Sequence, residues 1–380
     1  MTYLPLFFVI ASSIILTPFI AQAEILPNPT VIASSPVLSH STAVPANLFD
    51  GKVSEYASNG AGTNTFVTMD FGAPVLVDRF VLMTRRTLSA VVGSYELQFS
   101  ADTIFDSSDP SFTAAAAGSS GAGPIFAFPA TTARYVRWKV VTSVGSSQNL
   151  GGLEMRFLRA PQSPVFGPGV IAPAVVIASS PAFNANYANT NAVDGKAGIG
   201  DGNEYASAGA GTGTFVDFDL GAARPILSFD FFDRLTPTDR ARLFTLSFSN
   251  DPAFPAGAAT STLDCTPPGT GWGYSQALAA PLTARYVRYQ VTARIAIGAS
   301  SNQGISEMIF YTKPPTSVGN EAQLRSALAS LPNGDTLNFT ANITLAGNSN
   351  DLPALEASGV TINGNGFTLK GTSKNSILLF

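Results

Sequence analysis

The sequence predicts an all-β protein made of two copies of one sandwich domain and a shorter third segment. Three observations support this prediction. A long series of motifs occurs twice in the same order, apolar residues alternate with polar ones over short stretches in both copies, and turn-forming residues are frequent, with 34 glycines and 26 prolines. Neither copy holds a 3.6-residue apolar pattern of helical length, so many short antiparallel strands are expected.

The internal repeat fixes the domain boundaries. Its longest stretch, a 13-residue segment that begins with Glu-Tyr-Ala-Ser, is identical at 11 positions in the two copies. We therefore predict duplicated domains at residues 31–159 and 175–312, joined by a proline-rich linker at 160–174. The repeated segments, pair by pair, are Val31–Pro36 and Val176–Pro181, Glu55–Val67 and Glu204–Val216, and Ala133–Trp138 and Ala284–Tyr289.

Alternation that is kept in both copies shows which side chains face the core. Apolar residues at the core positions given below alternate with polar residues, which is typical of strands with one buried face. Trp138 alternates with the arginines of its strand and is predicted to be buried, while Arg134, Arg137, Arg285 and Arg288 are predicted to be structural. The core positions, in matched sets, are Val67, Met69, Phe71 and Val216, Phe218, Leu220; Tyr95, Leu97, Phe99 and Phe244, Leu246, Phe248; and Val136, Trp138, Val140 and Val287, Tyr289, Val291.

The third segment, residues 316–380, has a different pattern. Helical spacing of leucines predicts a short amphipathic helix over Glu321–Leu331, and short strands are expected after it, at 336–339, 343–345, 360–362 and 367–369. This order resembles the N-terminal end of a right-handed parallel β-helix, as in pectin-lyase-like and autotransporter-like proteins. The chain ends on the apolar run Ile377–Phe380 without a cap, so we expect the β-helix to be truncated.

Composition excludes several classes of function. Lys and Arg number 21 against 25 Asp and Glu, a net charge of −4, so the chain has no overall positive field to attract nucleic acid. A single histidine, His40, and a single cysteine, Cys265, exclude an intrachain disulfide, a Cys/His zinc cluster and a C-x-x-C pair. His40 is predicted to be a polar loop residue, and no nucleophile elbow accompanies it.

Residues 1–23 are predicted to be a secretion signal. The stretch is apolar and ends in Ala21-Gln22-Ala23, a small-x-small cleavage pattern. It has no charge at its start, so a membrane anchor or a misassigned start is the alternative, although Pro18 interrupts it. The mature chain would begin near Glu24 and be secreted or exposed on the cell surface, as in an exported bacterial protein.

The repeated motifs resemble those of the discoidin family, the coagulation factor V/VIII type C domains, which are related to galactose-binding carbohydrate modules. The resemblance rests on Ala-Ser-Ser, Asp-Gly, Glu-Tyr-Ala-Ser, Leu-x-Phe-Ser, Ala-Arg-Tyr-Val-Arg and a late glutamate, in that order in both copies. It implies two eight-stranded antiparallel jelly-roll sandwiches with ligand-binding loops at one end. Tyr56 and Tyr205 stand where the family commonly has tryptophan.

Members of this family often hold a structural calcium ion. The resemblance implies Asp50 with Glu154 in the first copy, and Asp194 with Glu307 in the second. Calcium prefers six to eight oxygen ligands, many of which backbone carbonyls of glycine-rich turns supply. The alternative is that Asp-Gly forms a plain turn and the glutamate lies at the surface.

The family's ligand loops commonly offer an arginine, an amide and an aromatic ring, a combination that suits sugar hydroxyls and the apolar face of a sugar. The matching residues are Arg85 and Asn149 in the first copy and Arg234 and Asn302 in the second. Both arginines have an alternative role as ordinary strand-edge charges. Trp272, in a loop that only the second copy has, is the candidate aromatic platform, with an interior or linker role as its alternative.

These residues favour a secreted or surface-exposed protein for carbohydrate binding and adhesion. The expected partners are a glycan or polysaccharide, or cell-surface or matrix components. No catalytic residues are predicted. The first alternative is a pair of targeting modules of a polysaccharide lyase or hydrolase whose β-helix catalytic domain is incomplete here. The second is a structural stalk that binds no ligand.

Overall fold

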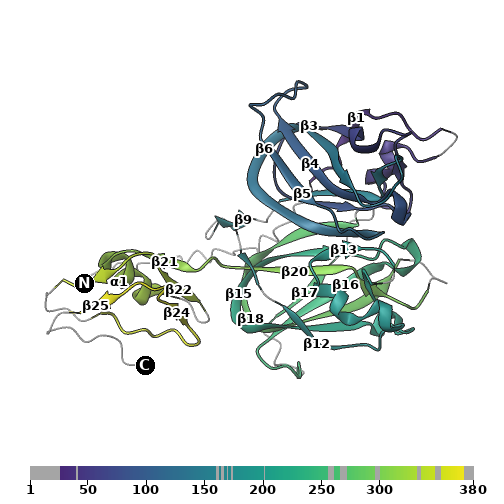
Figure 1. The fold of residues 1–380 in the computed structure, drawn as a ribbon. Coiled ribbons are helices and arrows are strands. Elements are labelled where there is room, and N and C mark those ends of the chain that lie inside the picture. The colour runs from purple at the N-terminus through teal and green to yellow at the C-terminus, as the bar shows by residue number, and fades with distance from the viewer. Residues whose placement is uncertain are drawn as a thin grey trace, which may run out of the picture.

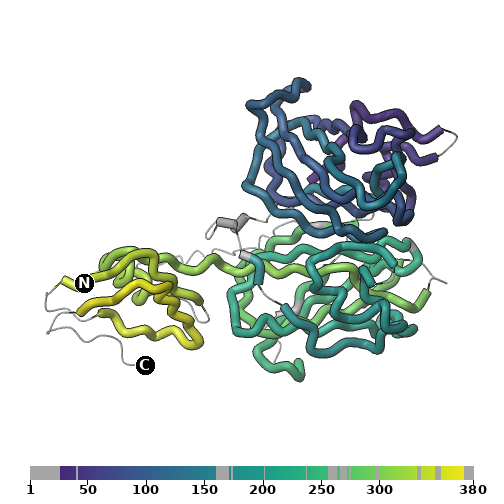
Figure 2. The backbone as a smooth tube through the Cα atoms, viewed as in Figure 1, coloured from purple at the N-terminus to yellow at the C-terminus, as the bar shows by residue number. Residues whose placement is uncertain are grey.

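A computed structural model describes residues 26–371, apart from 40–41, 160–161, 164–166, 169, 173, 201, 256–260, 266–271, 296–299, 332–334 and 347–351. The predicted signal segment, His40 and the run Ile377–Phe380 lie outside these residues. Two β-sandwiches pack against each other, and a smaller third unit extends from the second sandwich (Figures 1 and 2). The fold is nearly all β, and the sheets of both sandwiches are antiparallel, as predicted.

In the first sandwich, two long strands supply both layers. Strand β3 (Phe66–Met83) pairs with β6 (Ala122–Ser143), and their register breaks between Asp70 and Val75. The first half of β3 also pairs with β1 (Thr30–Ser34), and its second half with β8 (Glu154–Leu158). On the other side, the second half of β6 pairs with β4, and β4 with β5. The strands are β1 (Thr30–Ser34), β3 (Phe66–Met83), β4 (Val92–Ser100), β5 (Ser111–Ala115), β6 (Ala122–Ser143) and β8 (Glu154–Leu158).

The second sandwich repeats this plan strand for strand. The register between β15 and β18 breaks between Asp219 and Arg224, β12 and β20 pair with the two halves of β15, and β16 pairs with β18 and β17. A short strand inside the predicted linker, β11, also joins β20. The strands are β11 (Val170–Ile171), β12 (Val175–Ser179), β15 (Phe215–Phe232), β16 (Ala241–Ser249), β17 (Ser261–Cys265), β18 (Gly273–Arg294) and β20 (Glu307–Thr312).

The predicted core positions are confirmed. Every alternating apolar residue named above is buried, and Trp138 is fully buried between the layers of the first sandwich. Three of the four strand arginines make paired hydrogen bonds to aspartates of the neighbouring strand, which agrees with their predicted structural role. The pairs are Arg134 with Asp70, Arg285 with Asp219 and Arg288 with Asp217, at donor–acceptor distances of 2.7–3.0 Å.

One very short pair of strands shapes the loop end of each sandwich. β2 pairs with β7 in the first copy, and β14 with β19 in the second. The contact requires glycine, because a Cβ on Gly151 or Gly304 would lie 2.0 or 1.9 Å from the backbone oxygen of Tyr56 or Tyr205. These strands are β2 (Tyr56–Ala57), β7 (Gly151–Gly152), β14 (Tyr205–Ala206) and β19 (Gly304–Ile305).

Short 3-10 helices form much of the loops. They are η1 (Pro45–Phe49), η2 (Gly62–Asn64), η3 (Leu88–Ala90), η4 (Ala185–Tyr187), η5 (Asn189–Val193), η6 (Gly211–Gly213) and η7 (Pro237–Asp239). In the linker, β9 (Gln162–Ser163) pairs with β10 (Gly167–Pro168). Most of these helices lie in corresponding loops of the two copies.

The sandwiches are joined by more than the linker. Strand β13 (Lys196–Gly198) of the second copy pairs antiparallel with Ala122–Pro124 of β6 in the first. An apolar cluster spans the interface beside this pair. Its buried members are Val81, Met83, Leu153 and Leu158 from the first copy and Ala197, Phe232, Leu235 and Trp272 from the second.

The third unit contains the predicted helix, α1 (Glu321–Ser330), whose N-cap Asn320 accepts a hydrogen bond from the Gln323 amide. Its leucines pack on the strands, as the spacing predicted. The strands pair in parallel, in the order β21-β22-β24, and β23 with β25. They are β21 (Thr316–Val318), β22 (Thr336–Phe339), β23 (Ile343–Thr344), β24 (Thr361–Asn363) and β25 (Leu369–Lys370). Continuation as a β-helix stays a prediction.

Candidate functional site

The predicted ligand residues lie together at the loop end of each sandwich. Arg85 follows the end of β3, and its Nη1 donates to the backbone oxygen of Asn149, at 2.6 Å. In the second copy, Arg234 follows β15, and its Nη1 donates to the backbone oxygen of Asn302, at 2.5 Å. Each arginine therefore lies beside its asparagine at the loop end.

Each arginine also has an acidic partner that the sequence reasoning missed. Arg85 Nε lies 2.8 Å from Glu55 Oε2, and Arg234 Nη2 lies 2.9 Å from Glu204 Oε1. Both glutamates open the 13-residue repeat, directly before β2 and β14, so their conservation between the copies was the available signal. We call Glu55, Arg85 and Asn149 the first loop cluster, and Glu204, Arg234 and Asn302 the second loop cluster.

The asparagine side chains help to fix the loops. Asn149 Oδ1 accepts a hydrogen bond from the Gly60 amide at 2.8 Å, and Asn302 Oδ1 accepts one from the Gly209 amide at 2.9 Å. Each cluster is therefore held in one geometry before any ligand arrives, which lowers the ordering cost of binding.

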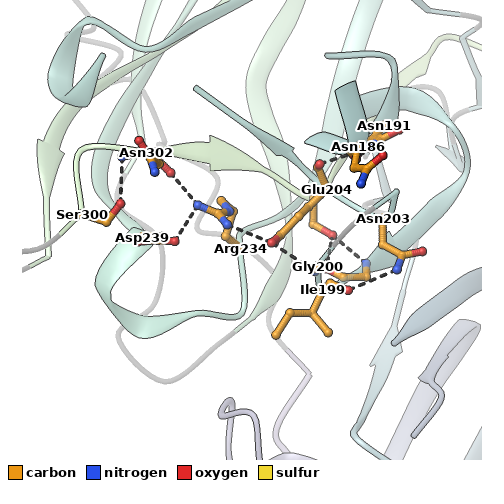
Figure 3. A network of polar contacts seen from close by, with 12 residues as sticks. Asn186, Asn191, Ile199, Gly200, Asn203, Glu204, Arg234, Asp239, Ser300 and Asn302 are labelled. Carbon is orange, nitrogen blue, oxygen red and sulfur yellow. Dashed lines mark hydrogen bonds and ion pairs between the residues drawn. The ribbon is translucent and has the colours of Figure 1, made fainter. Parts of the chain in front are cut away.

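The second loop cluster is part of a wider network of polar contacts (Figure 3). Arg234 has a second carboxylate partner, Asp239, at 2.7 Å, where the first copy has Ala90. The Gly200 amide donates to Glu204 Oε1, from a loop that is five residues longer than its counterpart. Burial raises the pKa of Glu204, and the nearby guanidinium opposes that rise.

Exposure separates the two clusters. Side-chain exposure is 12% for Arg85 and 19% for Glu55, against 5% for Arg234 and 1% for Glu204. The residues that directly follow the two arginines differ in the same way. Arg86 is exposed, whereas its counterpart Leu235 is buried between the sandwiches. The first loop cluster therefore presents charged donors to solvent, and the second uses its charges mainly within the fold.

Trp272 is not an exposed platform for a sugar. It is 2% exposed, and its ring packs edge-on against Phe232 with 5.3 Å between centroids, in the apolar cluster between the sandwiches. This corrects the assignment of Trp272 to the ligand site and supports its alternative interior role. The sequence gave no sign that the Trp272 ring packs at an interface between two domains.

A different aromatic pair lies beside the second loop cluster. Phe183 is 52% exposed and contacts Tyr187 edge-on, with 5.8 Å between ring centroids. The Arg234 guanidinium lies 5.7 Å from the Tyr187 ring. Phe183 thus offers an apolar face where Trp272 does not. The sequence signal was an asparagine-rich loop, residues 183–191, that carries two aromatic residues.

The aspartate–glutamate pairs predicted for calcium also lie together. The Lys52 amide donates to Asp50 Oδ1 at 2.8 Å and to Glu154 Oε1 at 3.1 Å. Burial, reinforced by the neighbouring Asp50, raises the pKa of Glu154 to about 9. Burial beside Asp194 likewise raises the pKa of Glu307 well above its ordinary value.

These pairs meet part of what calcium needs. In each pair the glutamate is buried and the aspartate reaches solvent, so a cation between them would stabilise both carboxylates. In the second copy Glu307 Oε2 is buried without a hydrogen-bond partner. No group of three or more His, Cys, Asp or Glu side chains suited to a metal occurs among residues 26–371 as far as they are described. Backbone carbonyls would therefore have to complete the shell.

Each copy is thus an antiparallel β-sandwich with a polar cluster at its loop end. Residues 30–154, within the first copy, match the F5/8 type C domain family, which the motifs resemble. The comparison with curated proteins found no match.

Solved structures that are similar include a fucolectin from striped bass (13% identity, 76% of this chain and 97% of that chain, TM-score 0.31). They also include the tandem CBM32-1 and CBM32-2 domains of Clostridium perfringens ZmpB (11% identity, 75% and 92%, TM-score 0.30). A third is the CBM32 of AlyQ in complex with 4,5-unsaturated mannuronic acid (21% identity, 35% and 99%, TM-score 0.28). In the described part of the chain, no helix has the length and apolar character to cross a membrane.

Proposed function

We propose that this chain is a secreted or surface-exposed glycan-binding protein whose sugars bind at the loop ends of the two sandwiches. The family match of residues 30–154, together with the preorganised and solvent-accessible Arg85–Glu55 pair, carries this proposal. A guanidinium and a carboxylate side by side offer fixed donors and acceptors to neighbouring sugar hydroxyls. The exposed guanidinium of Arg86 adds a further donor.

The second sandwich contributes in a different way. Its arginine is engaged by two carboxylates, so the exposed Phe183 ring, backed by Tyr187, is the proposed contact for the apolar face of a sugar. Two weak sites on one rigid pair of domains raise the effective concentration of the second site, which favours long or clustered glycans.

A glycan array tests the proposal and identifies the ligand. The full chain should bind a restricted set of glycans, with a stronger signal on multivalent than on monovalent presentations. An array with no binding above background, in calcium and in chelator, would contradict the proposal and favour a structural stalk.

The chain should not cleave polysaccharide. The sandwiches are proposed as binding modules, and the sequence offers no triad, metal cluster or defined carboxylate pair for catalysis in either copy. Reducing-end and unsaturated-product assays on pectin-like and other polymers should show no release above a buffer control. Cleavage that copurifies with the chain would instead support the alternative, a polysaccharide lyase or hydrolase.

Calcium is proposed as a structural ion at Asp50 with Glu154 and at Asp194 with Glu307. A ligand that binds only the native state raises the melting temperature by mass action. Millimolar calcium should therefore raise the melting temperature above that in chelator, and Asp50→Asn together with Asp194→Asn should remove the shift. Identical melting curves in calcium and chelator would refute calcium binding.

A further inference from the structure

The two loop clusters differ in net charge, although they occupy equivalent positions of the repeat. In the second copy Arg234 pairs with two carboxylates, Glu204 and Asp239 (Figure 3). One guanidinium against two carboxylates gives a formal net charge of −1. The Arg234 side chain is 5% exposed, and both of its Nη atoms already donate to partners within the fold. It therefore presents little positive charge to a ligand.

In the first copy two arginines share one carboxylate. Arg85 Nε donates to Glu55 Oε2 at 2.8 Å, and the backbone amide of Arg86 donates to Glu55 Oε1, also at 2.8 Å. The Arg86 side chain is exposed and has no ion pair among the described residues. Two guanidinium groups against one carboxylate give a formal net charge of +1.

The donors that carry this positive charge reach solvent. Arg85 Nη1 is held by the backbone oxygen of Asn149, whereas Arg85 Nη2 has no hydrogen-bond partner in the described part of the chain and is not one of the buried unpaired atoms. Arg85 Nη2 and the Arg86 guanidinium are therefore open to a ligand at the same loop end. Guanidinium groups bind anionic oxygens through paired, charge-assisted hydrogen bonds. The chain's net charge of −4 does not oppose this at contact, because salt screens charges beyond about 8 Å.

The first loop end also lacks the aromatic contact of the second. Leu38 occupies the position of the exposed Phe183, because their backbone amides donate to matching oxygens of β2 and β14. The two loops that carry the arginines and the asparagine of the first cluster, residues 84–90 and 143–149, contain no aromatic residue. Binding there depends on charge and hydrogen bonds rather than on ring stacking.

We infer that the first loop cluster takes a negatively charged saccharide unit, a uronate or a sulfated sugar, whereas the second takes a neutral one. Arg85 Nη2 and the Arg86 guanidinium donate to the anionic group of the sugar. The inference rests on the proposed glycan binding at the loop ends and adds the class of sugar at each end. The duplicated fold thus presents two different specificities.

Titration of the full chain with charged and neutral forms of the same sugar tests the inference. The probes are short oligosaccharides of glucuronate, galacturonate and mannuronate, each compared with its methyl ester, which keeps the ring and removes the charge. Galactose 6-sulfate, compared with galactose, tests the sulfated source. At least one anionic probe should bind about tenfold more tightly than its neutral counterpart. The difference should shrink in about 0.5 M salt, because the charged groups are accessible to solvent.

Two variants locate the preference for charge. Arg86→Leu gives the first copy the residue that the second copy has at this position. It should weaken binding of the anionic probe about fivefold and leave binding of the neutral probe unchanged. Lys139→Leu removes the same charge from an exposed position of β6 and should leave both affinities unchanged. An unchanged preference in Arg86→Leu, or an equal loss in Lys139→Leu, would overturn the inference.

The outcomes separate this inference from the proposed function. Neutral glycans that bind and lose affinity in Phe183→Ala, with no anionic probe bound more tightly than its neutral counterpart, would contradict the inference and leave the proposed function standing. Absence of binding by every glycan, charged or neutral, would contradict both.

Discussion

Replacing Asp230 by alanine should lower the free energy of unfolding by about 3–5 kcal/mol, because it leaves the buried Arg79 guanidinium without its main counter-charge. Asp230 is fully buried and pairs with Arg79 across the interface between the sandwiches. It also accepts hydrogen bonds from Tyr311, at 2.7 Å, and from Ser275, at 2.5 Å.

Denaturant unfolding of the wild type and the variant measures this loss. Arg79→Met combined with Asp230→Leu is the matched control, because it removes both fully buried charges together and leaves only the partly exposed Asp78 without its arginine, so it should recover most of the stability. A loss below 1 kcal/mol in Asp230→Ala would show that the interface does not depend on this ion pair.

Arg234→Ala should destabilise the protein much more than Arg85→Ala, although the two arginines occupy equivalent positions. Arg234 pairs with Glu204 and Asp239 in an enclosed site. Its removal leaves two carboxylates without their counter-charge and should lower the free energy of unfolding by about 3 kcal/mol. Arg85 has one partly exposed partner, Glu55, and its removal should cost about 1 kcal/mol or less.

The two variants are each other's control, because the same atoms are deleted from the same position of the repeat. Thermal and denaturant unfolding should show a lower stability for Arg234→Ala than for Arg85→Ala. Adding Glu204→Gln to Arg234→Ala should restore part of the lost stability. Equal destabilisation would mean that the extra carboxylate and the longer loop do not change the role of this arginine.

The duplication explains why so much of each sandwich was predictable. Alternation seen once is ambiguous, but alternation kept at Val67, Met69 and Phe71 and again at Val216, Phe218 and Leu220 identifies one buried face. The resemblance to the discoidin family placed Arg85 and Asn149, and Arg234 and Asn302, at the same loop end, and in the structure each arginine donates a hydrogen bond to its asparagine.

The contacts between the copies were not predictable in this way. Arg79 and Asp230 are 151 residues apart and have no pattern in common, and their pairing depends on how two folded domains meet. Trp272 was misassigned for the same reason, because its ring packs in the apolar cluster between the two sandwiches. Differences such as Asp239 for Ala90 look minor in the sequence, yet they change an accessible arginine into an enclosed one.

The central claim is that glycan binds at the loop ends, and calorimetric titration with the strongest array ligand tests it most directly. Arg85→Lys should weaken binding at least tenfold, because lysine lacks the planar fork of donors, and Phe183→Ala should weaken binding of multivalent glycan. Arg137→Lys, on the outer face of β6, should bind like the wild type. Unchanged affinity in both loop variants, with a loss in Arg137→Lys, would place the ligand along the sheet and contradict the claim.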